Sequence, residues 1–343
     1  MTRTAAVICP GRGTYNKDEL GYLRRHHADK KDLYADFDAI RAATGQTPVT
    51  VLDGAEQFSA ATYTRGDIAS PLIYVSSLAD ARSLAGDIDV VAVTGNSMGW
   101  YIALAVAAAV SVLDGFRIVN TMGTLMQEHL IGGQLIYPFV DEQWRADSRQ
   151  RQELLAAVAE IDACDDCDLS LSIDLGGMLV LAGNEAGLDA FEASQPSLQG
   201  RFPMRLPNHA AFHTALQAPV SKQGRERLGA VRFGQPLCPL IDGRGHVWWP
   251  DATDPEALRE YTLGQQVTEV YDFTRAIRSA AREFAPDLFI VTGPGTTLGG
   301  AVAQSLILCE WNGMKSKADF QSRQSQSPLL VSMGIQEQRP LVT

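Results

Sequence analysis

The chain has 343 residues, of which 45% are hydrophobic and 20% are charged, and its formal net charge is −11. This balance is typical of a globular enzyme rather than of a disordered or fibrous chain. The acidic excess argues against nonspecific nucleic-acid binding, because neutralising phosphates requires clustered Lys and Arg that are not outnumbered. The best local basic run spans residues 24–31 and is a candidate docking patch, although such a run is more often a solvated helix face.

The sequence predicts no membrane span, disulfide framework or metal site. Its longest apolar stretches, such as residues 101–113, fall short of the roughly 20 residues that cross a bilayer, and residues 1–4 lead into a strand instead of a signal segment. We therefore expect a cytoplasmic protein whose five cysteines are reduced. Cys164 and Cys167 form a single C-x-x-C without a second ligand pair. Nothing else in the chain demands a metal or an organic cofactor.

Alternating strand and helix patterns predict an α/β fold. Residues 5–9 and 90–94 are apolar runs that end at glycine-containing turns, as buried parallel strands do. Ligands bind at the carboxyl ends of such strands. Helices are expected behind the second turn, at residues 100–112 and from residue 113 onward.

A change of pattern between about residues 130 and 207 predicts a small inserted unit. Strand candidates at 134–139, 170–174 and 178–182 alternate there with helical segments at 149–161 and 185–194. The larger unit then resumes with strand-like segments at 239–242 and 288–292 and helix-like segments at 254–267 and 272–284. The residues from 315 onward are predicted to be a weakly ordered or peripheral extension.

The reactive chemistry is concentrated at residues 95–99, which read G-N-S-M-G between a strand and an Ala-rich helix. This G-x-S-x-G context is typical of a nucleophile elbow, in which a sharp turn exposes the serine oxygen, here that of Ser97. The next backbone amide, that of Met98, begins a helix and can stabilise an oxyanion. A tight structural turn with a hydrogen-bonded serine is the alternative.

A serine nucleophile needs a base, normally an imidazole. The chain has six histidines, and the residue pattern by itself ranks His213 little above the others, among them His129, His209 and His246.

Five motifs in the same order resemble those of the malonyl-CoA:acyl carrier protein transacylases and the acyltransferase domains of polyketide synthases. They extend over residues 5 to about 305. Residues 10–14 resemble the family's P-G-Q-G-S, 95–99 its G-H-S-[LM]-G, 123–127 follow the arginine of its R-G-x-x-M-Q, 211–213 match A-F-H, and 293–295 match a late G-P-G.

The resemblance implies a hydrolase-like parallel-sheet domain formed by residues 1–129 and 208–314. It also implies an inserted ferredoxin-like subdomain at residues 130–207 and a C-terminal extension at residues 315–343. In the family's site, the nucleophile would be Ser97, the base His213, the oxyanion donors the amides of Arg12 and Met98, and the group that orients the base the backbone carbonyl of Gln266.

The activity implied by the resemblance is acyl transfer from acyl-CoA to the phosphopantetheine thiol of an acyl carrier protein, through an acyl-Ser97 intermediate. Enzymes of this kind serve fatty acid and polyketide biosynthesis. The expected partners are therefore acyl-CoA and an acyl carrier protein, with no nucleic acid and no membrane.

The acyl group is left open by a departure from the family pattern. The arginine that clamps the malonyl carboxylate in the family falls on Met122, whose thioether cannot pair with a carboxylate. Acetyl or another uncarboxylated acyl group is one interpretation. The other is that Arg12, which replaces the family glutamine, supplies the cation. Arg117 is expected to face away, about 140° around the helix from Met122.

Three more residues are predicted to line the substrate pocket. Asn96 stands where the family has histidine, and Trp100 stands where it commonly has glutamate. Trp100 would either narrow the pocket or pack in the core. Phe212 is the bulky residue that accompanies small unbranched acyl groups in the family.

Two other functions remain open from the sequence. A thioester hydrolase that strips acyl groups from carrier proteins or CoA would use the same serine and histidine. A noncatalytic docking partner of a synthase would fit the altered residues Asn96 and Met122, although it would not require Ser97 and His213.

Overall fold

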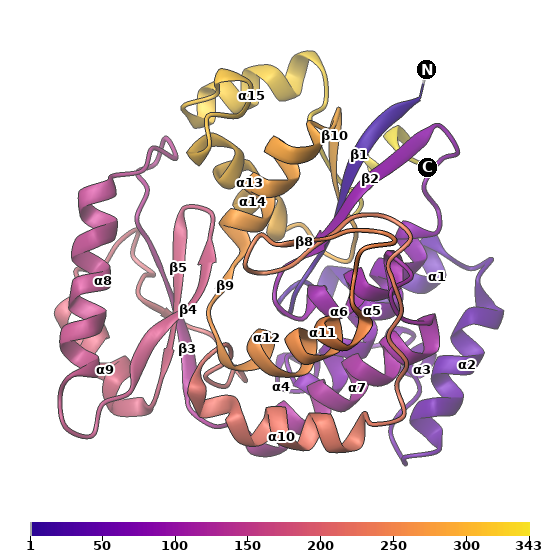
Figure 1. Ribbon diagram of the computed structural model, residues 1–343, viewed down its shortest axis with the longest axis horizontal. Helices are drawn as coiled ribbons and strands as arrows, with labels where there is room; N and C mark the ends of the chain where they lie inside the picture. The colour runs from indigo at the N-terminus through magenta and orange to yellow at the C-terminus, as the bar shows by residue number, and fades with distance from the viewer. Residues whose placement is uncertain (1) are drawn as a thin grey trace.

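The computed structural model describes residues 2–343, which fold around two β-sheets with helices packed on them (Figure 1). The larger sheet has six strands in the order β11-β10-β1-β2-β7-β8. These strands are β1 (Arg3–Cys9), β2 (Ile88–Gly95), β7 (Leu240–Ile241), β8 (Val247–Trp248), β10 (Leu288–Val291) and β11 (Leu330–Ser332). All neighbours pair in parallel except β7 and β8, so the predicted α/β class is confirmed.

The parallel pairing brings three of the predicted turns to one edge of the large sheet. In β1, every residue from Ala5 to Cys9 is buried, as expected for a strand covered on both faces. It pairs with β2 on one side and β10 on the other, so the turns after residues 9, 95 and 291 meet at the carboxyl ends.

Helices surround the large sheet, and several show the buried stripe that packing on a sheet requires. In α13, the buried residues recur at spacings of three and four, at Phe273, Ala276, Ile277 and Ala280. The helices outside the small sheet are α1 (Tyr22–His26), α2 (Lys31–Ala42), α3 (Val49–Asp53), α4 (Ala60–Tyr63), α5 (Gly66–Ala81), α6 (Gly99–Val106), α7 (Val112–His129), α10 (Ala218–Arg227), α11 (Pro255–Glu260), α12 (Gln266–Thr268), α13 (Phe273–Phe284), α14 (Leu298–Leu308) and α15 (Lys317–Gln326). Short helical turns are η1 (Lys17–Glu19), η2 (Ala215–Gln217), η3 (Tyr261–Gln265), η4 (Trp311–Gly313) and η5 (Arg339–Leu341).

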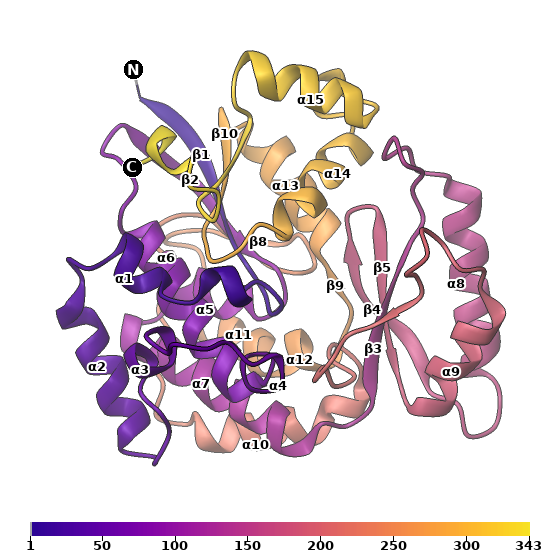
Figure 2. The same cartoon turned by 180° about the vertical axis from the view of Figure 1, so that it is seen from behind.

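The second sheet has five strands in the order β6-β3-β5-β4-β9 and forms the lobe on the left of Figure 1. Its strands are β3 (Gly133–Pro138), β4 (Leu169–Leu175), β5 (Met178–Gly183), β6 (Met204–Arg205) and β9 (Tyr271–Asp272). Helices α8 (Ser148–Asp162) and α9 (Glu185–Ser194) cover its outer side, as Figure 2 also shows. The strands and helices predicted in this part of the chain agree with these bounds within one or two residues.

Two predicted helices differ from the structure. The helix expected at residues 100–112 ends at Val106, because Ala108 takes a left-handed backbone with φ 57° and Ser111 caps the next helix by accepting from the Asp114 amide. The helix expected at 254–267 is divided into α11, a π-helical η3 and α12. A π-helical turn of this kind is often found at functional sites.

The prediction that the chain from residue 315 onward is weakly ordered or peripheral is wrong. Strand β11 pairs with β10 and so completes the large sheet, and Met333 beyond it is fully buried. Arg339 reaches the protein interior and pairs with the buried carboxylate of Asp80 at 2.8 Å. The polar composition of residues 315–327 belongs to one exposed helix, α15, and gave no sign of the apolar strand that follows it.

Among residues 2–343, no helix is both long and apolar enough to cross a membrane.

Candidate active site

The turn after β2 places Ser97 in a strained conformation at the carboxyl edge of the large sheet. Ser97 has φ 55°, in the left-handed region that non-glycine residues rarely occupy. The flanking glycines permit this turn: a Cβ on Gly99 would lie 2.2 Å from the Cys9 carbonyl oxygen, and one on Gly95 would lie 2.2 Å from the Gly99 carbonyl. The G-x-S-x-G spacing is therefore required by backbone contacts on both sides of the serine.

Ser97 and His213 form a hydrogen-bonded pair although 116 positions separate them in sequence. The serine Oγ lies 2.7 Å from His213 Nε2, and His213 Nδ1 lies 2.6 Å from the backbone carbonyl of Gln266. A carbonyl oxygen can only accept, so Nδ1 carries the proton and Nε2 accepts from the serine hydroxyl. This tautomer is the one that a general base needs.

Burial keeps the His213 ring neutral. Desolvation lowers its pKa from 6.5 to about 4, and the hydrogen bond to the Gln266 carbonyl opposes this shift only in part. His213 also has φ 58°, so both members of the pair occupy the left-handed region. The ring is free of a second proton at neutral pH and can accept the one from Ser97.

A pH profile follows from this lowered pKa. Because only the neutral ring can accept the serine proton, the rate of Ser97 acylation is expected to stay flat between about pH 8 and about pH 5 and to fall below about pH 4. The rate of adduct formation, measured by rapid quench and intact mass, checks this. A midpoint near the ordinary histidine value of 6.5 would contradict the burial of the ring. Circular dichroism at each pH separates loss of base from unfolding.

Gln266 is held so that its carbonyl points at the base. It follows the π-helical η3, its side-chain Oε1 accepts from the Tyr101 hydroxyl at 2.7 Å, and its Nε2 donates to the Ser97 carbonyl at 3.1 Å. The same residue therefore contacts both the histidine and the serine turn. The structure brings Gln266 to the place that the resemblance predicted for it.

Two backbone amides beside Ser97 have free hydrogen-bonding capacity. Within residues 2–343, neither the Arg12 amide nor the Met98 amide donates to a protein acceptor. Met98 directly precedes α6, where the helix dipole favours negative charge. A donor pair of this kind suits a developing oxyanion.

Two cavities adjoin Ser97. The larger, about 460 Å³, lies between the serine turn and the small sheet, and its walls include Asn96 and Phe212. The smaller, about 30 Å³, is closed by Met122, Met126 and Tyr101, and Phe212 and Arg12 border both. Asn96 therefore lines the larger cavity, Met122 the smaller one, and Phe212 both.

The prediction that Trp100 lines the substrate pocket is wrong. Trp100 is fully buried and borders neither cavity in the described chain. Its indole nitrogen donates to the Thr262 hydroxyl at 3.0 Å, and its ring packs edge-on against Tyr261. The residue that follows the elbow turns inward with helix α6 and packs in the core, which was the alternative interpretation.

Arg12 is an enclosed cation without a carboxylate partner. Its Nη2 donates to the backbone carbonyls of Thr64 at 2.5 Å and Asn208 at 2.8 Å, and its buried Nε has no acceptor in residues 2–343. Burial lowers the pKa of Arg12 to about 10, and the nearby Asp67 is paired with Arg65 instead. The exposed Arg117 pairs with Asp114 on the surface of α7, so it does not supply a cation to either cavity.

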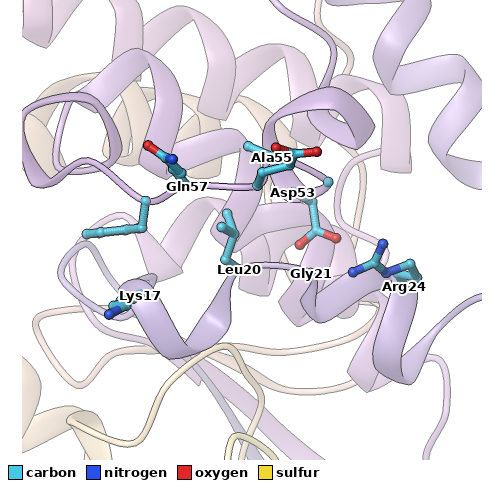
Figure 3. A pocket seen from close by; sticks show the side chains of 10 residues that line it. Lys17, Leu20, Gly21, Arg24, Asp53, Ala55 and Gln57 are labelled. Atoms are coloured by element: carbon cyan, nitrogen blue, oxygen red, sulfur yellow. The ribbon is translucent and has the colours of Figure 1, made fainter.

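Within the described residues, neither the hollow near Asp53 nor the Cys164–Cys167 pair contains a nucleophile bonded to a base. A hollow of about 640 Å³ lined by Lys17, Leu20 and Arg24 (Figure 3) contains the carboxylate of Asp53, which already accepts from the Tyr15 hydroxyl and the Leu23 amide. No cluster of metal ligands occurs in residues 2–343, and Cys164 and Cys167 are free thiols.

The basic run at residues 24–31 does not form one exposed patch. His27 is fully buried and bonds to the Asp80 carboxylate at 2.6 Å, whereas Arg24 and Arg25 are exposed.

Three polar residues at the site were not assigned to it from the sequence. His209 and Gln134 line the larger cavity, and Ser70, whose buried hydroxyl has no partner among the described residues, lines the smaller one. His209 was only one of several competing histidines. The only sequence feature that could have pointed to it is that it lies four positions before His213.

The chain is similar to known transacylases in sequence and in fold. It is 23% identical over 308 residues to the malonyl CoA-acyl carrier protein transacylase of Salmonella typhimurium, which covers 88% of this chain and 92% of that protein. The crystal structure of the malonyl-CoA:acyl carrier protein transacylase from Xanthomonas oryzae superposes with a TM-score of 0.78 at 18% identity, over 99% of this chain and 98% of that one. No protein-family model matches the chain.

A third similarity is to a malonyl-transacylase solved in complex with the acyl carrier protein of a type II polyketide synthase. The TM-score is 0.72 at 19% identity, over 95% of this chain and all (100%) of that one. The chain therefore shares the α/β fold of these transacylase structures, and its serine-histidine pair lies at the turn after β2. The resemblance to the malonyl-CoA:acyl carrier protein transacylases is confirmed over nearly the whole chain.

Proposed function

We propose that this protein transfers an acyl group from acyl-CoA to the phosphopantetheine thiol of an acyl carrier protein, through an ester on Ser97. The hydrogen-bond chain from Ser97 Oγ through His213 to the Gln266 carbonyl carries this proposal. The names of the relatives and of the similar structures support the reaction class and the two substrates.

In the first half-reaction, Ser97 Oγ attacks the thioester carbonyl carbon and gives its proton to His213 Nε2. The negative charge on the former carbonyl oxygen is stabilised by the amides of Arg12 and Met98. The carbon–sulfur bond then breaks, and the CoA sulfur leaves with the proton from His213. The product is an ester of Ser97 and free CoA.

In the second half-reaction, the carrier thiol gives its proton to His213, and its sulfur attacks the ester. The Ser97 oxygen leaves and regains the proton from Nε2. Because one thioester replaces another, the protein has to exclude water rather than drive the reaction. The apolar small-sheet side chains around the larger cavity, among them Ile173 and Val180, suit this exclusion.

The acyl group that we propose is malonyl, with Arg12 as the cation that meets its carboxylate. Arg12 is enclosed, lacks a carboxylate partner and borders the same small cavity as Met122. A Cβ on Gly66 would lie 2.6 Å from the Gly123 carbonyl oxygen and 3.6 Å from Arg12 Nη1, so the guanidinium lies beside the turn of α7 that carries Met122. Arg12, in the loop after β1, would thereby supply the positive charge that Met122 lacks.

The size of the small cavity agrees with a compact anionic group. Its volume of about 30 Å³ leaves no room for a long chain in this direction. Arg12 and Ser70 both line it, and Arg12 Nε and Ser70 Oγ are buried donors without partners among the described residues. Buried donors of this kind favour a ligand that accepts hydrogen bonds over an apolar one.

Moving the cation tests the role of Arg12. Arg12→Gln, which restores the family glutamine, is expected to lower the rate of malonyl loading by at least about 30-fold, because an interaction with a buried charge costs about 2 kcal/mol or more to remove. Acetyl loading should change by no more than about 3-fold. The double variant R12Q/M122R returns a guanidinium to α7 and should recover malonyl loading. Unchanged malonyl loading by Arg12→Gln would exclude Arg12 as the clamp.

The function as a whole is tested by intact-mass spectrometry of the wild type and Ser97→Ala after incubation with malonyl-CoA, acetyl-CoA and a longer acyl-CoA. We expect a malonyl adduct on the wild type alone, which disappears when a holo acyl carrier protein is added. An acetyl or longer adduct would assign Met122 to an uncarboxylated substrate. Release of free acid without an adduct would indicate the thioester hydrolase, for which no structural feature argues at present, and neither adduct nor turnover would indicate a docking protein.

We also propose how the chain is divided. Residues 130–207 run β3-α8-β4-β5-α9-β6, and this β-α-β-β-α-β order supports a ferredoxin-like subdomain inserted in a hydrolase-like large domain. The large domain would comprise residues 1–129 and 208–314, to which the strand β11 now adds the C-terminal segment. A cytoplasmic location fits a protein that uses CoA and carrier thioesters.

A further inference from the structure

A chain of hydrogen bonds runs from the backbone of Phe212, next to the base, to His209 at the larger cavity. Ser172 Oγ donates to the Phe212 carbonyl at 2.7 Å, Gln134 Nε2 lies 2.7 Å from Ser172 Oγ, and Gln134 Oε1 lies 2.9 Å from His209 Nδ1. Gln134 and Ser172 are buried on strands β3 and β4 of the small sheet. The proposed mechanism uses none of these three side chains.

The direction of every bond in this chain is determined by the Phe212 carbonyl. A carbonyl only accepts, so the Ser172 hydroxyl donates to it and accepts from the Gln134 amide NH₂. The Gln134 oxygen therefore faces His209 Nδ1, which must carry the proton. In the neutral imidazole, Nε2 is then left with a lone pair and acts only as an acceptor.

His209 lines the larger cavity with Ser97 and Arg12, and its Nε2 has no hydrogen-bond partner in the described chain. Burial, reinforced by the charge of Arg12, lowers the pKa of His209 well below its usual value, so the ring does not gain a second proton. Arg12 and His209 also pack on the same ring, with the Arg12 guanidinium carbon 5.4 Å and the His209 ring 5.7 Å from the centre of Phe212. The cavity is thus lined by Arg12, a cation, and by His209, whose Nε2 is an acceptor without a partner in the described chain.

We propose that His209 Nε2 accepts a hydrogen bond from an amide N–H of the pantetheine arm and positions the thioester over Ser97. This inference rests on the proposed function. The acyl end of a malonyl or acetyl thioester carries only acceptors, so it cannot satisfy Nε2. The amide N–H groups lie on the arm that CoA and the carrier protein share, and His209 would therefore act on both half-reactions as a positioning residue.

Two substitutions separate the acceptor from the rest of the ring. His209→Asn keeps an amide NH₂ near the position of Nδ1, which preserves the bond to Gln134, but it removes the acceptor at Nε2. His209→Gln places its terminal amide near Nε2 and so retains an acceptor there. Each is combined with three malonyl thioesters: those of CoA, of N-acetylcysteamine, which keeps one amide, and of propanethiol, which has none.

We expect His209→Asn to lower the second-order rate constant of Ser97 acylation about 5- to 10-fold with malonyl-CoA, the loss expected for one neutral hydrogen bond. The propanethiol thioester should be unaffected, and His209→Gln should retain most of the wild-type rate. A loss with the N-acetylcysteamine thioester assigns the amide nearest the sulfur, and a loss confined to CoA assigns the farther amide; either supports the inference.

An equal loss with all three thioesters, or no loss with any, would overturn the role of His209. If the propanethiol thioester does not react with the wild type, the comparison between the CoA and N-acetylcysteamine thioesters and rescue by His209→Gln decide the question. Acyl-Ser97 formation is read in the same mass spectra. Absence of any Ser97 adduct on the wild type would overturn the proposed function and with it this inference, whereas adducts without discrimination overturn the inference alone.

Discussion

His213→Ala is expected to lower the rate of Ser97 acylation by about 10⁴-fold or more, because the serine then has no base and its hydroxyl is a weak nucleophile at neutral pH. The nearest other histidine in sequence, His209, makes no hydrogen bond to Ser97 in the described residues, whereas His213 does. The measurement is the single-turnover rate of adduct formation with malonyl-CoA. Gln266 cannot take the proton, since its contact with His213 is a backbone carbonyl.

The matched control is His129→Ala, which removes an exposed histidine whose ring contacts only Gln223 in the described hydrogen-bond network. It should acylate at the wild-type rate. Residual acylation by His213→Ala within about 10-fold of the wild type would mean that another group activates Ser97. An unchanged thermal midpoint for both variants would exclude unfolding as the cause of any loss.

The nucleophile could be predicted from the sequence because its requirements are local. The strand, the two glycines and the following helix all lie within residues 88–106, and the glycines are needed for backbone contacts in that same turn. His213 and Gln266 could not be ranked in this way, since each meets Ser97 only through the tertiary fold. Their assignment depended on the resemblance to a family.

The sequence predicts which side chains of the small-sheet strands share a face, but not which face lines the cavity. Ile173 and Leu175 lie two residues apart on β4, and Met178 and Val180 do so on β5, as expected for side chains on one face of a strand. The sequence does not say which face meets the large domain. Trp100 illustrates the same limit, because an aromatic residue after the elbow fits both a pocket wall and the core until the helix direction is known.

The C-terminal segment was misjudged because its anchoring contacts span more than 250 residues. Arg339 bonds to the Tyr22 hydroxyl, 317 positions away, and no local pattern marks such a pair. The carboxylate of Asp80 is the centre of this cluster. It accepts from His27 at 2.6 Å, Tyr22 at 2.7 Å and the Gly293 amide at 2.6 Å, and it pairs with Arg339.

Asp80→Ala is expected to lower the free energy of unfolding by about 3–5 kcal/mol, because it leaves the Arg339 cation and the Gly293 amide buried without their acceptor. Asp87→Ala is the matched control: its carboxylate is half exposed and lies 4.0 Å from Arg3, and its loss should cost no more than about 0.5 kcal/mol. Urea unfolding of both variants measures the difference. A loss below about 1 kcal/mol for Asp80→Ala would mean that water or a rearranged partner replaces the carboxylate. Gly293 lies in the loop that leads from β10 to α14, and α14 contributes Leu298 to the larger cavity, so the Asp80 cluster links the C-terminal segment to an element that lines this cavity.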